Sequence, residues 1–127
     1  MRKELDDKLC ADYPEIFKDR HAPENQTAMC WGFSCGDGWY DIIDSLCFAI
    51  QNDVKWNKAK QPAAFQVKEK FGCLRFYLDS FSTDEMNGYI RMAELLSGKI
   101  CEICGSPGTN TEEKGWWRTR CEAHKGK

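Results

Sequence analysis

Two short cysteine-containing motifs constrain the fold of this chain more than any other feature of its sequence. Cys101 and Cys104 form a C-x-x-C pair, and Cys121 and His124 form a C-x-x-H pair after the intervening residues 105–120. Three thiolates and one imidazole make up a tetrahedral ligand set for Zn²⁺, and two residues between ligands let one tight turn direct both side chains at the same ion. Four protein ligands leave no open coordination position, so the spacing predicts one structural zinc ion rather than a catalytic one. The alternative is a set of unrelated side chains.

The residues around these motifs predict the local form of the zinc-binding tail. Gly105 follows the first pair and lets the backbone turn back, so that its amides can support the thiolates. Residues 105–115 are rich in turn formers, and residues 116–119 have the composition of a short strand. We expect a knuckle, then a small hairpin, then the second pair at the start of a terminal helix, as in treble-clef or zinc-ribbon-like tails.

The length of the chain fits one globular domain. The 127 residues divide into an expected α+β body over residues 1–98 and the zinc-binding tail over residues 99–127, packed on the body as a single domain overall. The formal net charge is only −2. This charge argues against a protein that is held on nucleic acid mainly by bulk electrostatics.

The other cysteines help to predict the cellular compartment of the protein. The chain has eight cysteines, and residues 1–7 lack the apolar stretch of a signal peptide. We therefore expect a cytoplasmic protein with free thiols, without disulfides and without a membrane span. Cys47 fits a small buried hydrophobic residue. Cys30 and Cys35 flank a turn and, together with His21, are either a second metal site or free thiols.

Apolar spacing and helix-breaking residues predict the elements of the first half. A helix is expected over residues 2–13 and ends before Pro14. The most regular apolar face follows Gly36-Asp37-Gly38 and continues to Ile50, and Asp37 is the expected N-cap of that helix. The segments between helices are predicted to be an exposed loop over 18–28, a strand within 29–34 and a loop over 52–62.

The second half predicts a hairpin followed by a helix. Apolar and polar residues alternate over residues 65–78 on both sides of Gly72. The segment Ser82-Thr83-Asp84-Glu85 has the form of a capping box, and Gly98 is a suitable helix end. The fold class is therefore α+β, with helices packed on a small antiparallel sheet. The expected inward positions are Phe65, Val67, Glu69 and Phe71, then Leu74, Phe76 and Leu78, and on the helix Met86, Ile90, Ala93 and either Leu96 or its neighbour.

The polar face of the predicted hairpin is a candidate binding surface. It gathers Lys68, Lys70 and Arg75 beside Tyr77. Positive charges next to an aromatic ring suit a phosphate-bearing ligand, a nucleotide or an acidic protein surface. The alternative is a solvated strand face whose lysines discourage pairing with other strands.

Aromatic residues and arginines also meet on the tail. Trp116 and Trp117 precede Arg118 and Arg120, an arrangement that holds a nucleobase or single-stranded nucleic acid. The alternative is that one tryptophan packs the tail against the body, so we expect one buried and one exposed ring. A protein that sequesters a small ligand should have a concave pocket that joins the basic hairpin face to Trp39 or Trp116. A protein that blocks a partner should instead expose an apolar patch.

Two other features give little support for function. Gly36-Asp37-Gly38 precedes a helix, where free amides favour anions, but Asp37 itself is expected to occupy them. His124 is a predicted zinc ligand, and His21 lies in a loop without a nucleophile motif beside it. No catalytic residue is predicted.

Three stretches of the sequence carry a resemblance. They are Gln66-Val67-Lys68-Glu69-Lys70-Phe71-Gly72-Cys73-Leu74-Arg75-Phe76-Tyr77, the motif Cys35-Gly36-Asp37-Gly38-Trp39 before an apolar helix, and the tail from Cys101 to His124. In the same order over residues 35–124, they resemble a group of small uncharacterised proteins encoded by bacteriophages and prophages. The resemblance implies a phage setting in the cytoplasm of a bacterial host and implies no activity. Small accessory phage proteins often antagonise host defences.

The sequence thus favours a non-enzymatic, phage-type binding protein with a structural zinc ion. Its expected contact residues are Lys68, Lys70, Arg75, Tyr77, Trp39, Trp116 and Arg118. The partner is either a phosphorylated, nucleotide-like small molecule or a host protein. The alternative is a zinc-ribbon-like nucleic-acid-binding protein that uses Trp117, Arg118 and Arg120, and an enzyme of unknown type ranks third.

Overall fold

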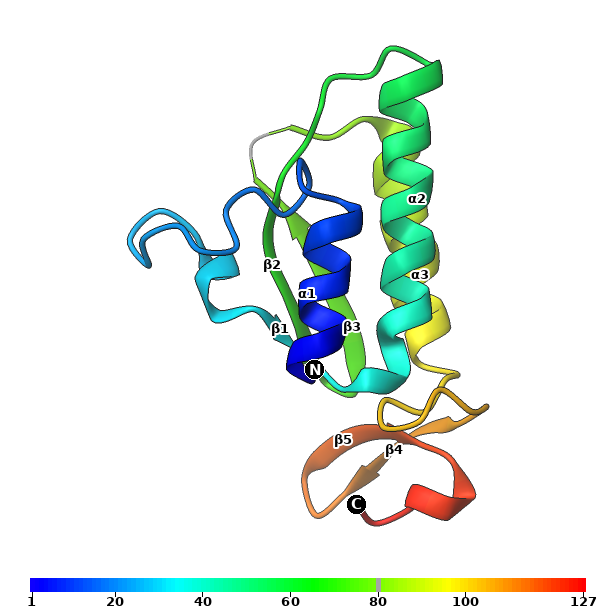
Figure 1. Cartoon of the computed structure of the whole chain (residues 1–127). Coiled ribbons are helices and arrows are strands. Elements are labelled where there is room, and N and C mark those ends of the chain that lie inside the picture. Colours follow the sequence, from blue (N-terminus) through cyan, green and yellow to red (C-terminus); the bar gives the residue numbers. More distant parts are fainter. Residues whose placement is uncertain (80) are drawn as a thin grey trace.

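The protein consists of a helix-and-sheet body with a small tail docked on one end. The computed structural model describes residues 1–79 and 81–127. In Figure 1 the tail, coloured orange to red, lies against the end of the body where α2 begins and α3 ends. The predicted α+β class is confirmed. The body contains α1 (Lys3–Asp12), α2 (Tyr40–Trp56), α3 (Asp84–Ser97), β1 (Phe33–Ser34), β2 (Ala64–Lys70) and β3 (Cys73–Leu78), and the tail contains β4 (Thr109–Glu113) and β5 (Trp116–Arg120).

The sheet of the body has the order β1-β2-β3 and is mixed. β2 and β3 form the predicted antiparallel hairpin, in which Lys68 lies opposite Arg75. The hairpin turn is made by Phe71 and Gly72, whose φ angles are 54° and 79°. β1 runs parallel to β2 instead of antiparallel, because a long connection that includes α2 joins the two strands.

One face of the sheet forms the hydrophobic core. Val67, Leu74 and Phe76 are buried there with apolar residues of α1 and α2. Two predicted inward positions are exposed. Phe65 lies at a register shift between Ala64 and Gln66, which turns its side chain outward, and Phe71 occupies the hairpin turn. The opposite face of the sheet, which we call the outer face, carries Gln66, Lys68, Lys70, Cys73, Arg75 and Tyr77.

Helix α3 covers the free edge of β3. The backbone amide of Leu74 donates to Ser97 Oγ over 2.8 Å, and the amide of Phe76 donates to Glu94 Oε2 over 3.1 Å. These amides point away from β2 and would otherwise lack a partner in the sheet. The N-cap of α3 is Thr83, whose hydroxyl accepts from Met86 N, instead of the expected Ser82. Of the two positions expected to end the buried stripe, Leu96 is exposed and its neighbour Ser97 is buried.

The first half differs from its prediction at three places. The expected strand over 29–34 shortens to β1, because Thr27 caps a 3-10 turn over Ala28–Trp31 and Gly32 ends the turn with a φ of 76°. Helix α2 continues through Trp56, so part of the expected loop over 52–62 is helical. Asp37 does not cap α2. Its carboxylate accepts instead from the backbone amide of Arg2.

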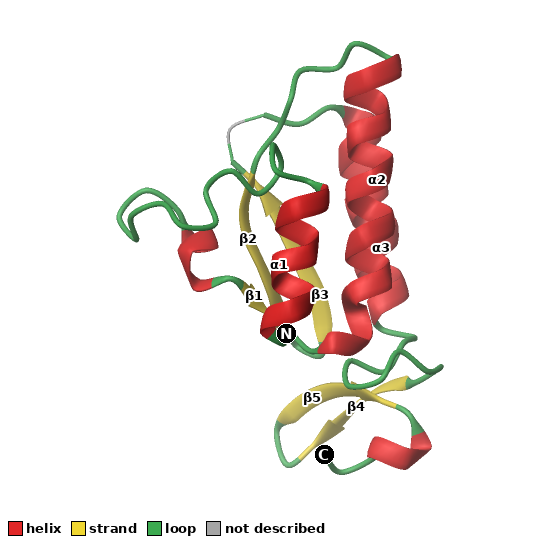
Figure 2. Cartoon of the chain, viewed as in Figure 1, coloured by secondary structure: helices red, strands yellow, loops and turns green. Residues whose placement is uncertain are grey.

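Among the described residues, α1, α2 and α3 all belong to the body, whereas the tail contains β4, β5 and a short 3-10 turn over Glu122–His124. Figure 2, coloured by secondary structure, shows this difference between the two regions. No helix in the described ranges combines the length and the apolar composition needed to cross a membrane.

Candidate metal centre and binding surface

The four predicted metal ligands meet at one point in the tail. The ligand atoms of Cys101, Cys104, Cys121 and His124 all lie within 4.8 Å of one another. The Sγ atoms of Cys104 and Cys121 are 3.7 Å apart, and His124 Nδ1 is 3.3 Å from Cys121 Sγ. Among the described residues this is the one cluster of three or more such side chains that could hold a metal ion. The alternative metal site at His21, Cys30 and Cys35 is therefore not formed.

The backbone around the cluster holds the ligands in place. Gly105 has a φ of 84°, and its amide donates to Cys101 O over 2.9 Å, which closes the predicted knuckle. Hydrogen bonds from the hydroxyl and amide of Ser106 lower the pKa of Cys104 to about 7. A lowered pKa favours the thiolate, which is the form that binds metal. Of the second pair, Cys121 directly precedes a single 3-10 turn over Glu122–His124, and His124 ends it. A terminal helix was predicted here.

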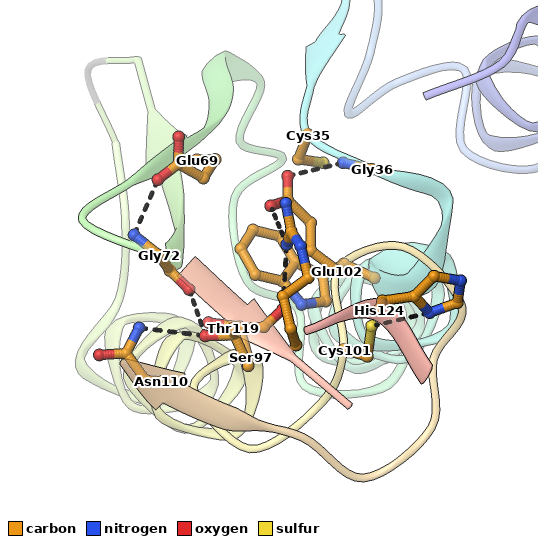
Figure 3. Close-up of polar contacts among 12 residues, drawn as sticks. Cys35, Gly36, Glu69, Gly72, Ser97, Cys101, Glu102, Asn110, Thr119 and His124 are labelled. Carbon is orange, nitrogen blue, oxygen red and sulfur yellow. Dashed lines mark hydrogen bonds and ion pairs between the residues drawn. The ribbon is translucent and has the colours of Figure 1, made fainter. Parts of the chain in front are cut away.

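Glu102, between the first two cysteines, fastens the tail to the body. Its Oε2 accepts from Gly36 N over 2.9 Å (Figure 3). Its backbone carbonyl accepts from Gly38 N over 2.7 Å. Its Oε1 pairs with Arg120 Nη1 over 3.2 Å. The amides before α2, where an anion site was considered, are thus occupied by the carboxylate and the backbone carbonyl of Glu102. A Cβ on Gly38 would overlap the carbonyl of Cys101, so the close approach requires glycine.

A second polar contact joins the β2–β3 turn to the tail hairpin. Thr119 is fully buried, and its hydroxyl donates to Gly72 O over 2.6 Å. Asn110 Nδ2 donates to Thr119 Oγ1 over 3.1 Å (Figure 3). It also donates to Phe71 O over 3.3 Å. These hydrogen bonds therefore hold the metal centre at a fixed position relative to the β2–β3 turn.

The tryptophans do not occupy the positions expected of them. Trp39 is fully buried, and its Nε1 donates to Ile100 O over 2.9 Å. It anchors the start of the tail and cannot contact a ligand. Trp116 and Trp117 are both exposed, at 68% and 42% of their surface, so neither packs the tail against the body. The polar contacts of Glu102, Thr119 and Asn110 perform that role.

The outer face of the sheet brings the predicted basic residues together. Lys68, Lys70 and Tyr77 line a shallow groove of about 560 Å³, with Phe65 at its border. Arg75 lies across from Lys68 and lines the adjoining hollow with Arg91 and Glu94. No described residue forms an ion pair with Lys68, Lys70 or Arg75, whereas the carboxylate of Glu94 accepts from the backbone of β3.

A second groove lies between the β2–β3 turn and the tail. It has a volume of about 410 Å³, and Lys70, Phe71, Trp116, Trp117 and Arg118 line it together with Glu69 and Glu102. This is the concave site that was expected to join the basic face to Trp116. Arg120, by contrast, is paired with Glu102 and its side chain is only 10% exposed, so it adds little to a contact surface.

A third groove is apolar. It lies between α2 and α3, has a volume of about 370 Å³, and is lined mainly by Ile42, Leu46, Tyr89, Met92 and Leu96. Met92 is 59% exposed. This is the exposed apolar patch that was expected of a protein that blocks a partner.

The cysteines outside the metal cluster are spread over the body. Cys47 is fully buried as predicted, and burial raises the pKa of its thiol well above the usual range. Burial also raises the pKa of Cys35 to about 12. Both thiols are therefore protonated and unreactive in the folded protein.

Comparison with protein-family models, with curated proteins and with solved structures gives no match. Function is therefore inferred from the geometry of the metal centre and the grooves.

Proposed function

We propose that this chain is a non-enzymatic binding protein in which one structural zinc ion fixes the tail and the outer face of the sheet binds a phosphorylated, nucleotide-like ligand. In the phage setting that the sequence resemblance implies, such a protein sequesters a nucleotide signal and so antagonises a host defence. The two parts of the proposal are supported by different observations and are tested separately.

The ligand geometry supports zinc. Two sulfur ligands at about 2.3 Å from a tetrahedral ion lie roughly 3.8 Å apart, and Cys104 Sγ and Cys121 Sγ are 3.7 Å apart. Three sulfurs and one ring nitrogen are a set that Zn²⁺ prefers over Mg²⁺ or Ca²⁺, which take oxygen ligands. Four protein ligands complete the coordination, so the ion serves folding and supplies no catalytic position.

The observation that carries the binding proposal is the pair Lys68 and Arg75. Like charges directly opposite each other on neighbouring strands destabilise a sheet. Lys68 and Arg75 are such a pair in the β2–β3 register, and no carboxylate in the described ranges forms an ion pair with either. A bound phosphate would relieve this repulsion and accept two hydrogen bonds from the arginine. Lys70 and the exposed ring of Tyr77 extend the same surface.

The first test is native mass spectrometry of the protein purified from cells, with and without a chelator. We expect one zinc ion per chain and a co-purifying nucleotide-like molecule. Titration calorimetry with ATP then measures the affinity of the outer face. Arg75→Ala and Lys68→Ala should each lower it by roughly 10-fold to 150-fold, since a hydrogen bond to a charged group contributes about 1.5–3 kcal/mol. Lys55→Ala, on α2 and away from the face, is the matched control. ATP binding that is equal in all four proteins would contradict the proposal.

A partner protein is the second candidate, and the apolar groove between α2 and α3 favours it. Grooves between helices accept an amphipathic helix of a partner. Met92→Glu places a charge in the groove, whereas Leu95→Glu changes an equally exposed apolar residue that does not line it. If a host protein that co-purifies with the wild-type chain is lost with Met92→Glu and retained with Leu95→Glu, this candidate is supported. If both variants retain the protein, the groove is not the binding surface.

A further inference from the structure

Lys70 lies where two grooves of the protein meet. It lines the groove on the outer face of the sheet, with Lys68 and Tyr77, and also the groove between the β2–β3 turn and the tail, with Trp116. The two grooves are therefore parts of one surface. This surface begins on the outer face of the sheet, passes the hairpin turn and ends on β5 of the tail.

Exposed aromatic rings border this surface along its whole course. A cluster of large exposed apolar side chains is uncommon on a protein that acts alone and marks a binding site. Nucleobases stack on such rings whatever their sequence, because every base has a π-face. The rings are Phe65 and Tyr77, each 41% exposed, on the first groove, and Phe71 at 65%, Trp116 at 68% and Trp117 at 42% on the second.

The charges along the surface are available to an anion. No residue of the described ranges forms an ion pair with Lys68, Lys70 or Arg118. The carboxylates of the second groove are engaged within the protein: Glu69 accepts from Gly72 N over 2.7 Å, and Glu102 accepts from Gly36 N and pairs with Arg120. The lysines and Arg118 therefore remain as the free basic groups beside the rings, and Asp79 is the acidic side chain that lines the first groove.

We infer that this surface binds a segment of single-stranded nucleic acid that extends over both grooves. The inference rests on the proposed function, because its first half is the site proposed above for a nucleotide-like ligand. Each groove alone has a volume in the range of roughly 300–1,000 Å³ that one small ligand occupies. A single nucleotide accounts for one groove, and a continuing strand accounts for both. Rings for the bases beside lysines and arginine for the phosphates are the arrangement of proteins that bind single strands.

The number of free cations sets the salt dependence. Neutralising about three phosphates of a single strand gives a slope of about −2 for log K against log salt. A modest slope is expected for a chain whose net charge is −2. Stacking of bases on the rings supplies the rest of the binding free energy.

The test is fluorescence anisotropy of the zinc-loaded full chain with a labelled dT12 oligonucleotide, beside titration with the mononucleotide dTMP. We expect dT12 to bind at least about tenfold more tightly than dTMP. Trp116→Ala should weaken dT12 binding by about 5-fold to about 100-fold, the loss measured for one stacked base, and should leave dTMP binding unchanged. Lys68→Ala should weaken both. The matched control is Trp56→Ala, because Trp56 on α2 is also 68% exposed and lies outside both grooves.

The outcomes separate this inference from the proposed function. If dT12 binds no more tightly than dTMP, or if Trp116→Ala has no more effect than Trp56→Ala, the extended site is overturned, while dTMP binding that depends on Lys68 leaves the proposed function standing. Equal binding of single-stranded and double-stranded dT12·dA12 also overturns it, since duplex bases cannot stack on the rings. If neither dT12 nor dTMP binds, the extended site is overturned, and the ATP titration described above decides the proposed function separately.

Discussion

The body and the tail of this protein are stabilised by different means. The body buries a continuous apolar core that includes Leu9, Trp39, Ile43 and Phe76. In the tail, the buried residues are Cys101, a metal ligand, and Thr119, a hydrogen-bonded hydroxyl. A segment as short as residues 99–127 cannot bury enough apolar surface to fold alone, so we expect a metal ion held by the Cys/His cluster to take the place of a core. The body and the tail should therefore respond to different perturbations.

Loss of the metal should separate the two regions most strongly. Cys101→Ser removes the buried ligand of the cluster, and structural zinc contributes about 10–16 kcal/mol to the folding of small zinc modules. We expect the amide signals of residues 99–127 to collapse in a two-dimensional NMR spectrum while those of α1, α2 and the sheet keep their dispersion. Excess chelator on the wild-type protein should give the same spectrum. Simultaneous loss of signals from the body would show that the two regions are not independent.

A cavity in the core should have the reverse effect. Ile43 is fully buried on α2, and Ile43→Ala should lower the free energy of unfolding of the body by about 2–5 kcal/mol. Zinc affinity, measured by competition with a chromogenic chelator at a temperature where the body is folded, should remain that of the wild type. A large drop in zinc affinity would contradict the independence of the metal centre.

The contact between the tail and the body can be weakened without changing the apolar core of the body or the metal ligands of the tail. In Gly38→Ala the new Cβ overlaps the carbonyl of Cys101, and overpacking of this kind costs roughly 1–3 kcal/mol. We expect faster hydrogen exchange of the amides of Gly36 and Gly38, with one zinc ion still bound. Gly88→Ala is the control, because a Cβ there meets nothing within 4 Å and alanine favours the helix. Zinc loss in Gly38→Ala would mean that docking and metal binding are inseparable.

The smallest effect is expected from the contact between the two hairpins. Thr119→Val removes the hydroxyl that donates to Gly72 O, which should cost about 0.5–1.5 kcal/mol. Chemical-shift changes should concentrate at Phe71, Gly72 and Asn110. Thr111→Val changes an exposed threonine of β4 and should leave these signals in place. If both variants shift them equally, the hydroxyl contact does not hold the hairpins together.

The features that the sequence predicts correctly depend on neighbouring residues. The metal ligands follow from the spacing of two pairs, α2 from its apolar period, and the β2–β3 hairpin from alternation around Gly72. The errors depend on distant residues. Asp37 would cap α2 if the segment stood alone, but Glu102 occupies those amides from the tail and Asp37 turns to Arg2. Trp39 was predicted to contact a ligand, but its ring nitrogen donates to the carbonyl of Ile100, which is distant in the sequence.

Some functional residues gave no usable signal. Glu102, Asn110 and Thr119 are ordinary polar residues of a tail, and only the three-dimensional arrangement shows that they join it to the body. The two glycines at positions 36 and 38 were the available indication, because paired glycines mark a place where another backbone approaches closely. The approaching group proved to be the metal-binding knuckle instead of a phosphate.

The position of Glu102 also has a consequence for biosynthesis. The amides that it binds belong to residues 36 and 38, which leave the ribosome long before residues 99–127. Domains fold in the order in which the chain emerges, and two of the four predicted metal ligands, Cys121 and His124, lie near the end of the chain, well after the last body helix, which ends at Ser97. We therefore expect a zinc ion to be acquired last, so that a shortage of the metal during growth should yield chains with a folded body and an unattached tail.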